Sequence, residues 1–469
     1  MFIVVVLSLY LLGGLSQTWA SFVVWGIKEI IASLGITSPN IDGILKLPST
    51  VAQYLDYFEL RPEETAYKAC SRCYTLYPSH RDIPSECTAK YECTTCSQTL
   101  NDSFAVVTQS FDHWLGSRLL RPDWEASIKQ YSESVPPPIG SGPLLENDRM
   151  RDIWHGCGLA ELKRADGDVE FFPAQGQDLH LAFSLGVDGF NPYTQKVAGV
   201  TASAHVYLLI CLSLPPEIRY EPDNIYIYGV FPGSPNTERS NNIISPLVTC
   251  LLAFWTTGVH FTSTHEFPQG RIVRAVLGPL LCDLIAARQV AGHASHSSKN
   301  DLCTVCYAST MNWERLNLPA FRTGKEQREA AERWKNARSA EERDALFASA
   351  GVRYSELLRL PYWDPTKMVV VDSLHQLLLG IIQRFCRDVW GMNSSNPDTE
   401  GMEPIPSIRT TALNKAEELL YLRDWSGLGK LSSPLLYRLC YEHGLWRGSR
   451  SKEHLLETLK SWVSFPLGL

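Results

Sequence analysis

The sequence of 469 residues lacks a net positive charge, because 43 Lys and Arg stand against 50 Asp and Glu, a formal net charge of −7. Overall charge therefore cannot attract nucleic acids, and any contact with DNA must come from a local basic patch. Glycine and proline, with 31 and 28 residues, are too few for a collagen-like chain. A hydrophobic content of 45% excludes a wholly disordered one. The length predicts about three domains.

The first 27 positions contain no Lys or Arg, and residues 2–14 are almost entirely apolar. A secretory signal peptide normally starts with a positively charged segment, and this one has none. The first uninterrupted apolar run is shorter than the roughly 20 residues of a membrane span. A signal or anchor and a pair of buried helices both stay open, and we favour the helices. Their buried faces would carry Leu7, Leu11, Leu12 and Leu15 on one helix, and Phe22, Val23, Ile27, Ile30 and Ile31 on the other.

The thirteen cysteines are unevenly spaced, and their odd number argues against a fully paired secreted framework. Five of them lie close together, namely Cys70, Cys73, Cys87, Cys93 and Cys96. Two Cys-x-x-Cys pairs, 70/73 and 93/96, have the spacing of a zinc ribbon, in which each pair directs two thiolates at one ion. Since a structural zinc ion takes four ligands, either Cys87 or Cys93 would be spare. The alternative is a set of ordinary buried thiols.

The periodicity predicts an α/β chain. Helices are expected over 51–58, 114–131, 245–258, 271–289 and 373–390, and strands over 178–188, 206–214, 224–230 and 368–372. A charge-rich helical insertion is expected over 324–349. Proline-bearing segments at 134–143 and 393–407 predict linkers. The expected parts are an N-terminal helical region (1–60), a zinc-ribbon-like region with a helix (61–133), a core (144–392, insertion about 290–366) and a helical module (408–469).

Six ordered motifs resemble the transposases of CACTA-type (En/Spm) DNA transposons, in the form found in mushroom genomes. They are CSRCYTLY at 70–77, GVDGFNP at 186–192, SLPP at 213–216, FPGSP at 231–235, GVRYSELLRLPYWDP at 351–365 and VDSLHQLLLG at 371–380. The resemblance runs from the apolar N-terminus to the end of the chain, and it supports the interpretation of that N-terminus as helices. Full-length relatives continue past the position that corresponds to Leu469.

This resemblance implies an RNase H-like catalytic core, in which acidic residues hold two Mg²⁺ or Mn²⁺ ions that cut and join DNA strands. Asp188, at the end of the first core strand, matches the first carboxylate, and Asp283 matches the second. Asp372 is the best-placed third acid and Glu356 a poorer one. Asp372 is equally well explained as a helix cap, and in that case the third acid would lie in a C-terminal part beyond this chain.

The family also carries a cysteine pair after the second acid, which corresponds to Cys303 and Cys306. Together with His296 and His375, these cysteines would form a structural zinc clip. A buried cysteine pair with solvent-facing histidines is the alternative.

The C-terminal segment 431–460 resembles a SAP-type DNA-binding module, with a helix, a short basic loop and a second helix. Arg447, Arg450, Lys452 and Lys460 would contact DNA phosphates. A small helical hairpin packed on the core is the alternative.

The resemblance thus predicts a nuclear transposase that binds transposon-end DNA, with structural zinc, no membrane and a homo-oligomer among its expected partners. Two other functions stay open. One is an inactive remnant that keeps the zinc and SAP-like modules, and the other is a secreted or membrane-associated cysteine-rich protein, suggested only by the apolar N-terminus.

Overall fold

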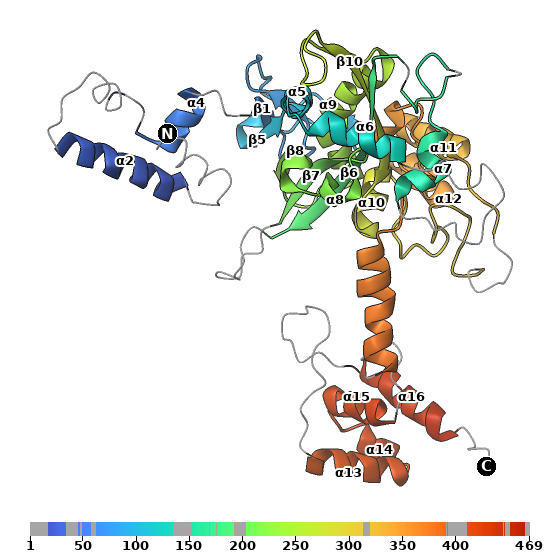
Figure 1. Ribbon diagram of the computed structural model, residues 1–469. Helices are drawn as coiled ribbons and strands as arrows, with labels where there is room; N and C mark the ends of the chain where they lie inside the picture. Colours follow the sequence, from blue (N-terminus) through green and yellow to red (C-terminus); the bar gives the residue numbers. More distant parts are fainter. Residues whose placement is uncertain are drawn as a thin grey trace. The chain divides into compact units, whose positions relative to one another are not determined.

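The computed structural model describes residues 17–33, 46, 49–57, 62–134, 152–167, 169–174, 176–191, 203–312, 319–390, 392, 410–443, 445 and 451–464. Contacts divide the chain into two compact units, 1–383 and 384–469. The first unit contains a mixed eight-stranded sheet with helices around it (Figure 1). The expected α/β class is confirmed.

The strands of the sheet lie in the order β2-β1-β5-β8-β7-β6-β10-β9. All neighbours are antiparallel except β6 and β10, which are parallel. The bounds are β1 Glu64–Ala69, β2 Leu76–Pro78, β5 Phe104–Gln109, β6 Leu179–Phe190, β7 Ala204–Cys211, β8 Ile225–Pro232, β9 Val259–Phe261 and β10 Arg271–Leu280. Val369 adds a parallel bridge to Leu280 at the end of β10. A separate small hairpin consists of β3 Lys90–Tyr91 and β4 Thr94–Thr95.

The helices of the first unit lie before, between and after these strands. They are α2 Gln17–Ser33, α4 Val51–Tyr57, α5 Phe111–Leu119, α6 Trp124–Ser134, α7 Cys157–Ala160, α8 Pro216–Arg219, α9 Thr237–Thr256, α10 Leu284–Ala291, α11 Gly324–Asn336 and α12 Ala340–Ala350. Short 3₁₀ turns are η1 Leu100–Asp102, η2 Ile153–His155, η3 Pro222–Asn224 and η4 Glu356–Arg359. Helices α11 and α12 form where the charge-rich insertion is expected.

An aromatic cluster ties two helices to the sheet. The ring of Phe111 on α5 meets Phe183 of β6 edge-on at a centroid distance of 5.2 Å and Phe254 of α9 at 5.1 Å. All three residues are almost fully buried. Strand β6 is central in the sheet, and its run of residues 180–187 is buried on both faces, which explains the nearly continuous apolar sequence.

The helix expected over 271–289 is wrong, since this segment divides into β10 and α10. A continuous apolar run does not distinguish a buried strand from a buried helix, and β10 pairs with β6 inside the sheet. The helix expected over 114–131 is interrupted between α5 and α6, where Pro122 follows Arg121. The strand expected over 368–372 is reduced to the single bridge at Val369.

The N-terminal helix α2 packs against α4, where the backbone N–H of Val51 donates to Ser21 Oγ at 3.1 Å. The predicted burial of Phe22, Val23 and Ile30 is wrong, because these residues are 56%, 36% and 59% exposed. The short α4 covers only a narrow face of α2. Residues 7, 11, 12 and 15 lie outside the described residues. No helix in the described part of the chain has the length and apolar character that a membrane span needs.

The second unit has a core of its own, built by α13 Thr410–Tyr421, α14 Trp425–Leu428, α15 Ser433–Glu442 and α16 Lys452–Ser464. Leu436, Leu439 and Leu459 are fully buried in it.

The helix expected over 373–390 forms as two π-helical segments, η5 Leu374–Ile382 and η6 Phe385–Val389. The expected linkers lie outside the described residues, except for Ser134 at the end of α6.

Candidate metal centres

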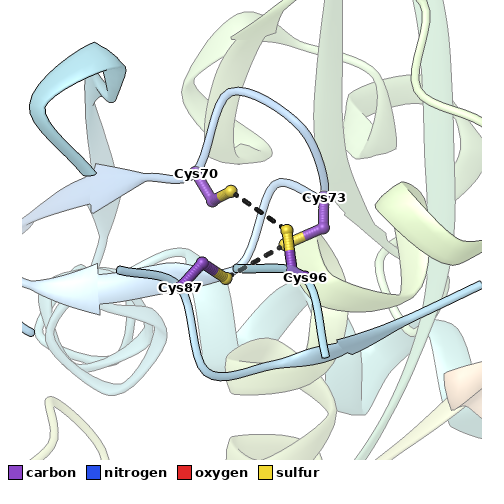
Figure 2. A group of neighbouring side chains, drawn as sticks. All are labelled: Cys70, Cys73, Cys87 and Cys96. Carbon is purple, nitrogen blue, oxygen red and sulfur yellow. Dashed lines mark hydrogen bonds between the residues drawn. The ribbon is translucent and has the colours of Figure 1, made fainter. Parts of the chain in front are cut away.

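Four cysteines meet in a buried cluster beside the end of β1. The Sγ atoms of Cys70 and Cys96 are 3.7 Å apart, those of Cys73 and Cys87 are 3.5 Å apart, and all four lie within 4.8 Å of one another (Figure 2). Tetrahedral zinc with Zn–S bonds of about 2.3 Å places its sulfurs about 3.8 Å apart. The sulfurs therefore stand at the spacing of a four-thiolate site, and the cluster can hold a structural zinc ion.

The choice between Cys87 and Cys93 follows from the hairpin that carries them. Cys87 and Cys96 lie near its base, where the N–H of Cys87 donates to Gln98 O and the N–H of Cys96 to Ala89 O. Cys93 lies at its tip between β3 and β4, with a positive φ of 67°. The structure thus brings Cys87 into the cluster and leaves Cys93 outside it. Pair spacing alone does not show this, because the second Cys-x-x-Cys pair spans the tip of the hairpin.

Hydrogen bonds favour the thiolate form of Cys87. Burial raises the pKa of its thiol, but the Tyr77 hydroxyl, at 3.3 Å from the sulfur, and the Ala89 N–H favour the thiolate and leave the pKa below its ordinary value. Burial raises the pKa of Cys73 well above the ordinary value. A metal ion would favour the thiolate of Cys73. Tyr77 is a contributor that spacing does not reveal.

The cysteine cluster is joined to the sheet and to α9. Arg239 Nε donates to the carbonyl oxygen of Arg72 at 2.8 Å, and Asn242 Nδ2 donates to that of Cys73 at 2.8 Å. Both acceptors belong to the turn that holds the first cysteine pair. Metal binding in this turn would therefore stabilise two contacts with the first turns of α9.

Two predicted acids lie just beyond the paired part of β6 and β10, which ends at Leu185 and Leu280. The N–H of Leu281 donates to Leu185 O at 2.9 Å, and the N–H of Val187 lies 3.2 Å from Cys282 Sγ, so the chain continues beside β6 beyond β10. Asp188 follows Val187 and is exposed. Asp283 follows Cys282, and its side chain caps α10 by accepting the Ala286 N–H at 2.6 Å.

Asp372 lies three residues after Val369, which bridges the end of β10. Its Oδ1 accepts the N–H of Leu374 at 2.8 Å, and its Oδ2 is paired with His375 Nδ1. The pKa of His375 is raised, first by the hydrogen bond with Asp372 and further by the negative charges of Asp372, Asp283 and Asp188. The three acids therefore act on one imidazole, and Asp372 has the contacts of a helix cap.

These carboxylates are near one another without forming a closed ligand cluster. Within the ranges that the structure describes, only the four cysteines place three or more ligand atoms within 4.8 Å of one another. Glu356, the poorer third acid, accepts from Arg359 at 2.8 Å and from Ser245 at 2.9 Å. These bonds to α9 and to its own η4 neighbour occupy Glu356, and it is not among the acids that act on His375.

The predicted zinc clip is not assembled. Cys303 and Cys306 lie close to each other. His375 is instead paired with Asp372, and His296 is exposed and lines a pocket between α9 and α10. Among the residues with described positions, these four do not form a ligand cluster. Spacing along the chain does not reveal that His375 faces the acids.

The predicted phosphate-contacting residues of the C-terminal module are only partly described. Lys452 begins α16, and Lys460 Nζ lies 5.8 Å from the centroid of the Trp425 ring. Arg447 and Arg450 lie outside the described residues.

In comparisons with known proteins, no family model matches this chain and no curated protein is detectably similar to it.

Proposed function

We propose that this chain is a transposase-like protein of the CACTA type, with an RNase H-like core that binds transposon-end DNA and carries out metal-dependent strand cleavage and transfer. The observation that supports it best is the strand order β8-β7-β6-β10 with the Val369 bridge beyond. An RNase H-like core is built on such an arrangement. It has an antiparallel three-stranded meander, its first strand pairs on the other side with a parallel fourth strand, and a fifth parallel strand lies beyond the fourth. Asp188 lies near the end of β6, Asp283 three residues after β10, and Asp372 three residues after the bridge at Val369.

The donor set fits a hard divalent cation. Asp188 has no hydrogen-bond or ion-pair partner for its carboxylate oxygens among the described residues, and Asp283 uses one oxygen for its helix cap. Bound Mg²⁺ or Mn²⁺ would stabilise the charges on the attacking and leaving oxygens of a phosphoryl displacement. Asp188 and Asp283 would hold and orient the cations. Asp372 would join them by giving up its contact with His375.

The other parts suit a DNA-binding role in the nucleus. The cysteine cluster would stabilise the turn that contacts α9, and the SAP-like module would bring Lys452 and Lys460 to DNA phosphates. Assembly into a homo-oligomer on two transposon ends is part of the same proposal.

A second candidate is a catalytically inactive remnant that acts only as a zinc-containing DNA-binding protein. The contacts of Asp372 favour it, because both oxygens are engaged by Leu374 and His375 and the described acids form no closed cluster. A site with only two acids would bind cations too weakly for strand cleavage.

The test is nicking of a supercoiled plasmid that carries the genomic DNA from both sides of the coding region, in Mg²⁺ or Mn²⁺. Wild-type protein should nick it, and Asp188→Asn and Asp283→Asn should lower the rate at least about 100-fold. Asp166→Asn, which changes an exposed acid in a turn, is the matched control. Robust cleavage by Asp188→Asn would refute the acid assignment, and a wild type as inert as the variants would favour the remnant.

A further inference from the structure

A pocket of about 410 Å³ lies between the first turn of α9 and helix α10. We call it the α9–α10 pocket. Arg288 and Gln289 of α10 line it together with Asn236 and Glu238 at the start of α9, Trp334 of α11 and Arg353. Its volume lies within the range of about 300–1,000 Å³ that is typical of small-ligand sites.

The pocket lies at the end of the sheet that carries the acids. Pro232, the last residue of β8, pairs with Ala204, and Asp188 pairs with Val206 of the same strand β7. Arg288 follows Asp283 by five residues on α10, which is about 7.5 Å along the helix axis. On its other side, Asn236 Nδ2 donates to the Tyr91 hydroxyl in the cysteine-bearing hairpin at 3.1 Å. The pocket therefore lies between the candidate catalytic acids and the cysteine cluster.

Two arginines give this pocket the chemistry of an anion site. Arg288 is only 3% exposed, and its terminal nitrogens donate to the carbonyl oxygens of Ala294, Asp301 and Leu302, whereas its buried Nε has no hydrogen-bond partner among the described residues. Arg353 packs its guanidinium on the Phe347 ring at 3.5 Å; Asp344 and Glu238 are near enough to act on its charge, but none of the described residues accepts a hydrogen bond from its guanidinium. Arg353 is half-buried, whereas the Nε of Arg288 is a buried cationic donor without an acceptor, which is costly, and a bound anion would remove that cost.

The remaining walls fit an extended phosphate ester better than a bare ion. Helix α9 has 20 residues and starts at this pocket; the Asn236 side chain accepts the N–H of Arg239 at 2.9 Å, and the positive end of the helix faces the same space. The single acid, Glu238, is already neutralised by Arg343, at 2.6 Å. Trp334 is 6% exposed and the Arg343 guanidinium lies over its ring at 4.3 Å, so the apolar contact open to a ligand comes from Ile285 of α10, which is 59% exposed. Phosphate oxygen would meet the arginines, and the sugar and base would meet the apolar side.

We propose that the α9–α10 pocket binds one nucleotide of a DNA strand, with its phosphodiester at Arg288 and Arg353, and so guides that strand toward the acids. This inference rests on the proposed function. It assigns to Arg353 a binding role and leaves the catalytic acids untouched.

The test measures DNA binding without catalysis. A fluorescein-labelled 12-nucleotide single strand is titrated in EDTA and followed by anisotropy at several salt concentrations, with sodium phosphate as a competitor. Arg353→Gln should weaken binding about tenfold and lower the salt slope by about 0.7, the loss of one phosphate contact to a single strand. Arg353→Lys should keep most of the slope. Arg121→Gln, between α5 and α6 and ion-paired with Asp223 at the opposite end of β8, is the matched control and should bind like wild type.

A second variant covers the case in which Arg353→Gln does not fold, as judged by thermal melting. Gln289→Glu adds a negative charge to the pocket wall and should weaken binding at least as much. Unchanged affinity and slope in both folded variants would overturn the proposal. So would tight binding of phosphate alone, because the pocket would then be a small-anion site. Since no cleavage is measured, loss of binding in Arg353→Gln supports the pocket even if the wild type proves unable to cut DNA.

Discussion

The cysteine cluster allows the sharpest prediction about stability. Its local core contains two buried residues besides the cysteines, Tyr91 and Leu100, whose burial contributes about 3–6 kcal/mol in total, and the partly buried Tyr77, Ile83 and Ala89 add smaller amounts. A structural zinc ion contributes about 10–16 kcal/mol of apparent binding free energy in zinc-finger peptides. The metal is therefore the larger stabilising term, and this part of the chain should lose its structure when one ligand is removed.

Cys87→Ser should lower the zinc content from about one ion per chain to well below half and weaken zinc affinity by more than about 100-fold. Cys93→Ser is the matched control, because it removes the same atom at the tip of the hairpin, outside the cluster. Elemental analysis measures the zinc content, and amide hydrogen exchange measures the stability of the turn that holds Cys70 and Cys73. Exchange should also rise in the first turns of α9, which contact that turn through Arg239 and Asn242. Zinc loss in Cys93→Ser with retention in Cys87→Ser would refute the assignment.

Three further outcomes follow from single contacts. Burial lowers the pKa of His293 to about 4, so the unfolded chain binds its proton more tightly between pH 4 and about 6.5. This histidine alone should lower the free energy of unfolding by about 3 kcal/mol from pH 7 to pH 4, and urea melts of His293→Gln should show a correspondingly smaller fall. An identical pH slope in both proteins would contradict the prediction. Phe111→Ala should cost about 3–5 kcal/mol, because the ring contacts both Phe183 and Phe254, and a loss under about 1 kcal/mol in urea melts would contradict this packing. Asp152→Ala should cost about 3–5 kcal/mol by leaving the buried Arg219 unpaired; a neutral effect would show that its bonds to the carbonyls of Leu212 and Leu214 suffice.

The sequence predicts the meander well, because β6, β7 and β8 have apolar strand patterns bounded by turn residues. It fails for β10, because α10 follows β10 after only three residues and the combined apolar run over 271–289 has the length of a helix. Strands β1, β2 and β5 also escape prediction, because their pairing with one another and with β8 is a long-range property.

The candidate sites show the same difference between features set by local spacing and features set by long-range pairing. Local spacing identifies Cys70, Cys73 and Cys96, whereas the inclusion of Cys87 depends on hairpin pairing. The approach of Asp283 to Asp188 depends on the parallel pairing of β10 with β6. The position of His375 at the acids, away from the Cys303–Cys306 pair, depends on the bridge at Val369.

The most direct test of the central claim, that Asp188, Asp283 and Asp372 hold divalent cations, is Mn²⁺ binding to zinc-loaded protein by electron paramagnetic resonance. This measurement needs no knowledge of the DNA ends. We predict that wild-type protein takes up Mn²⁺ and that Asp188→Asn, Asp283→Asn and Asp372→Asn each weaken the uptake at least about tenfold, while Asp166→Asn does not. Equal Mn²⁺ uptake by wild type and all three acid variants would contradict the claim.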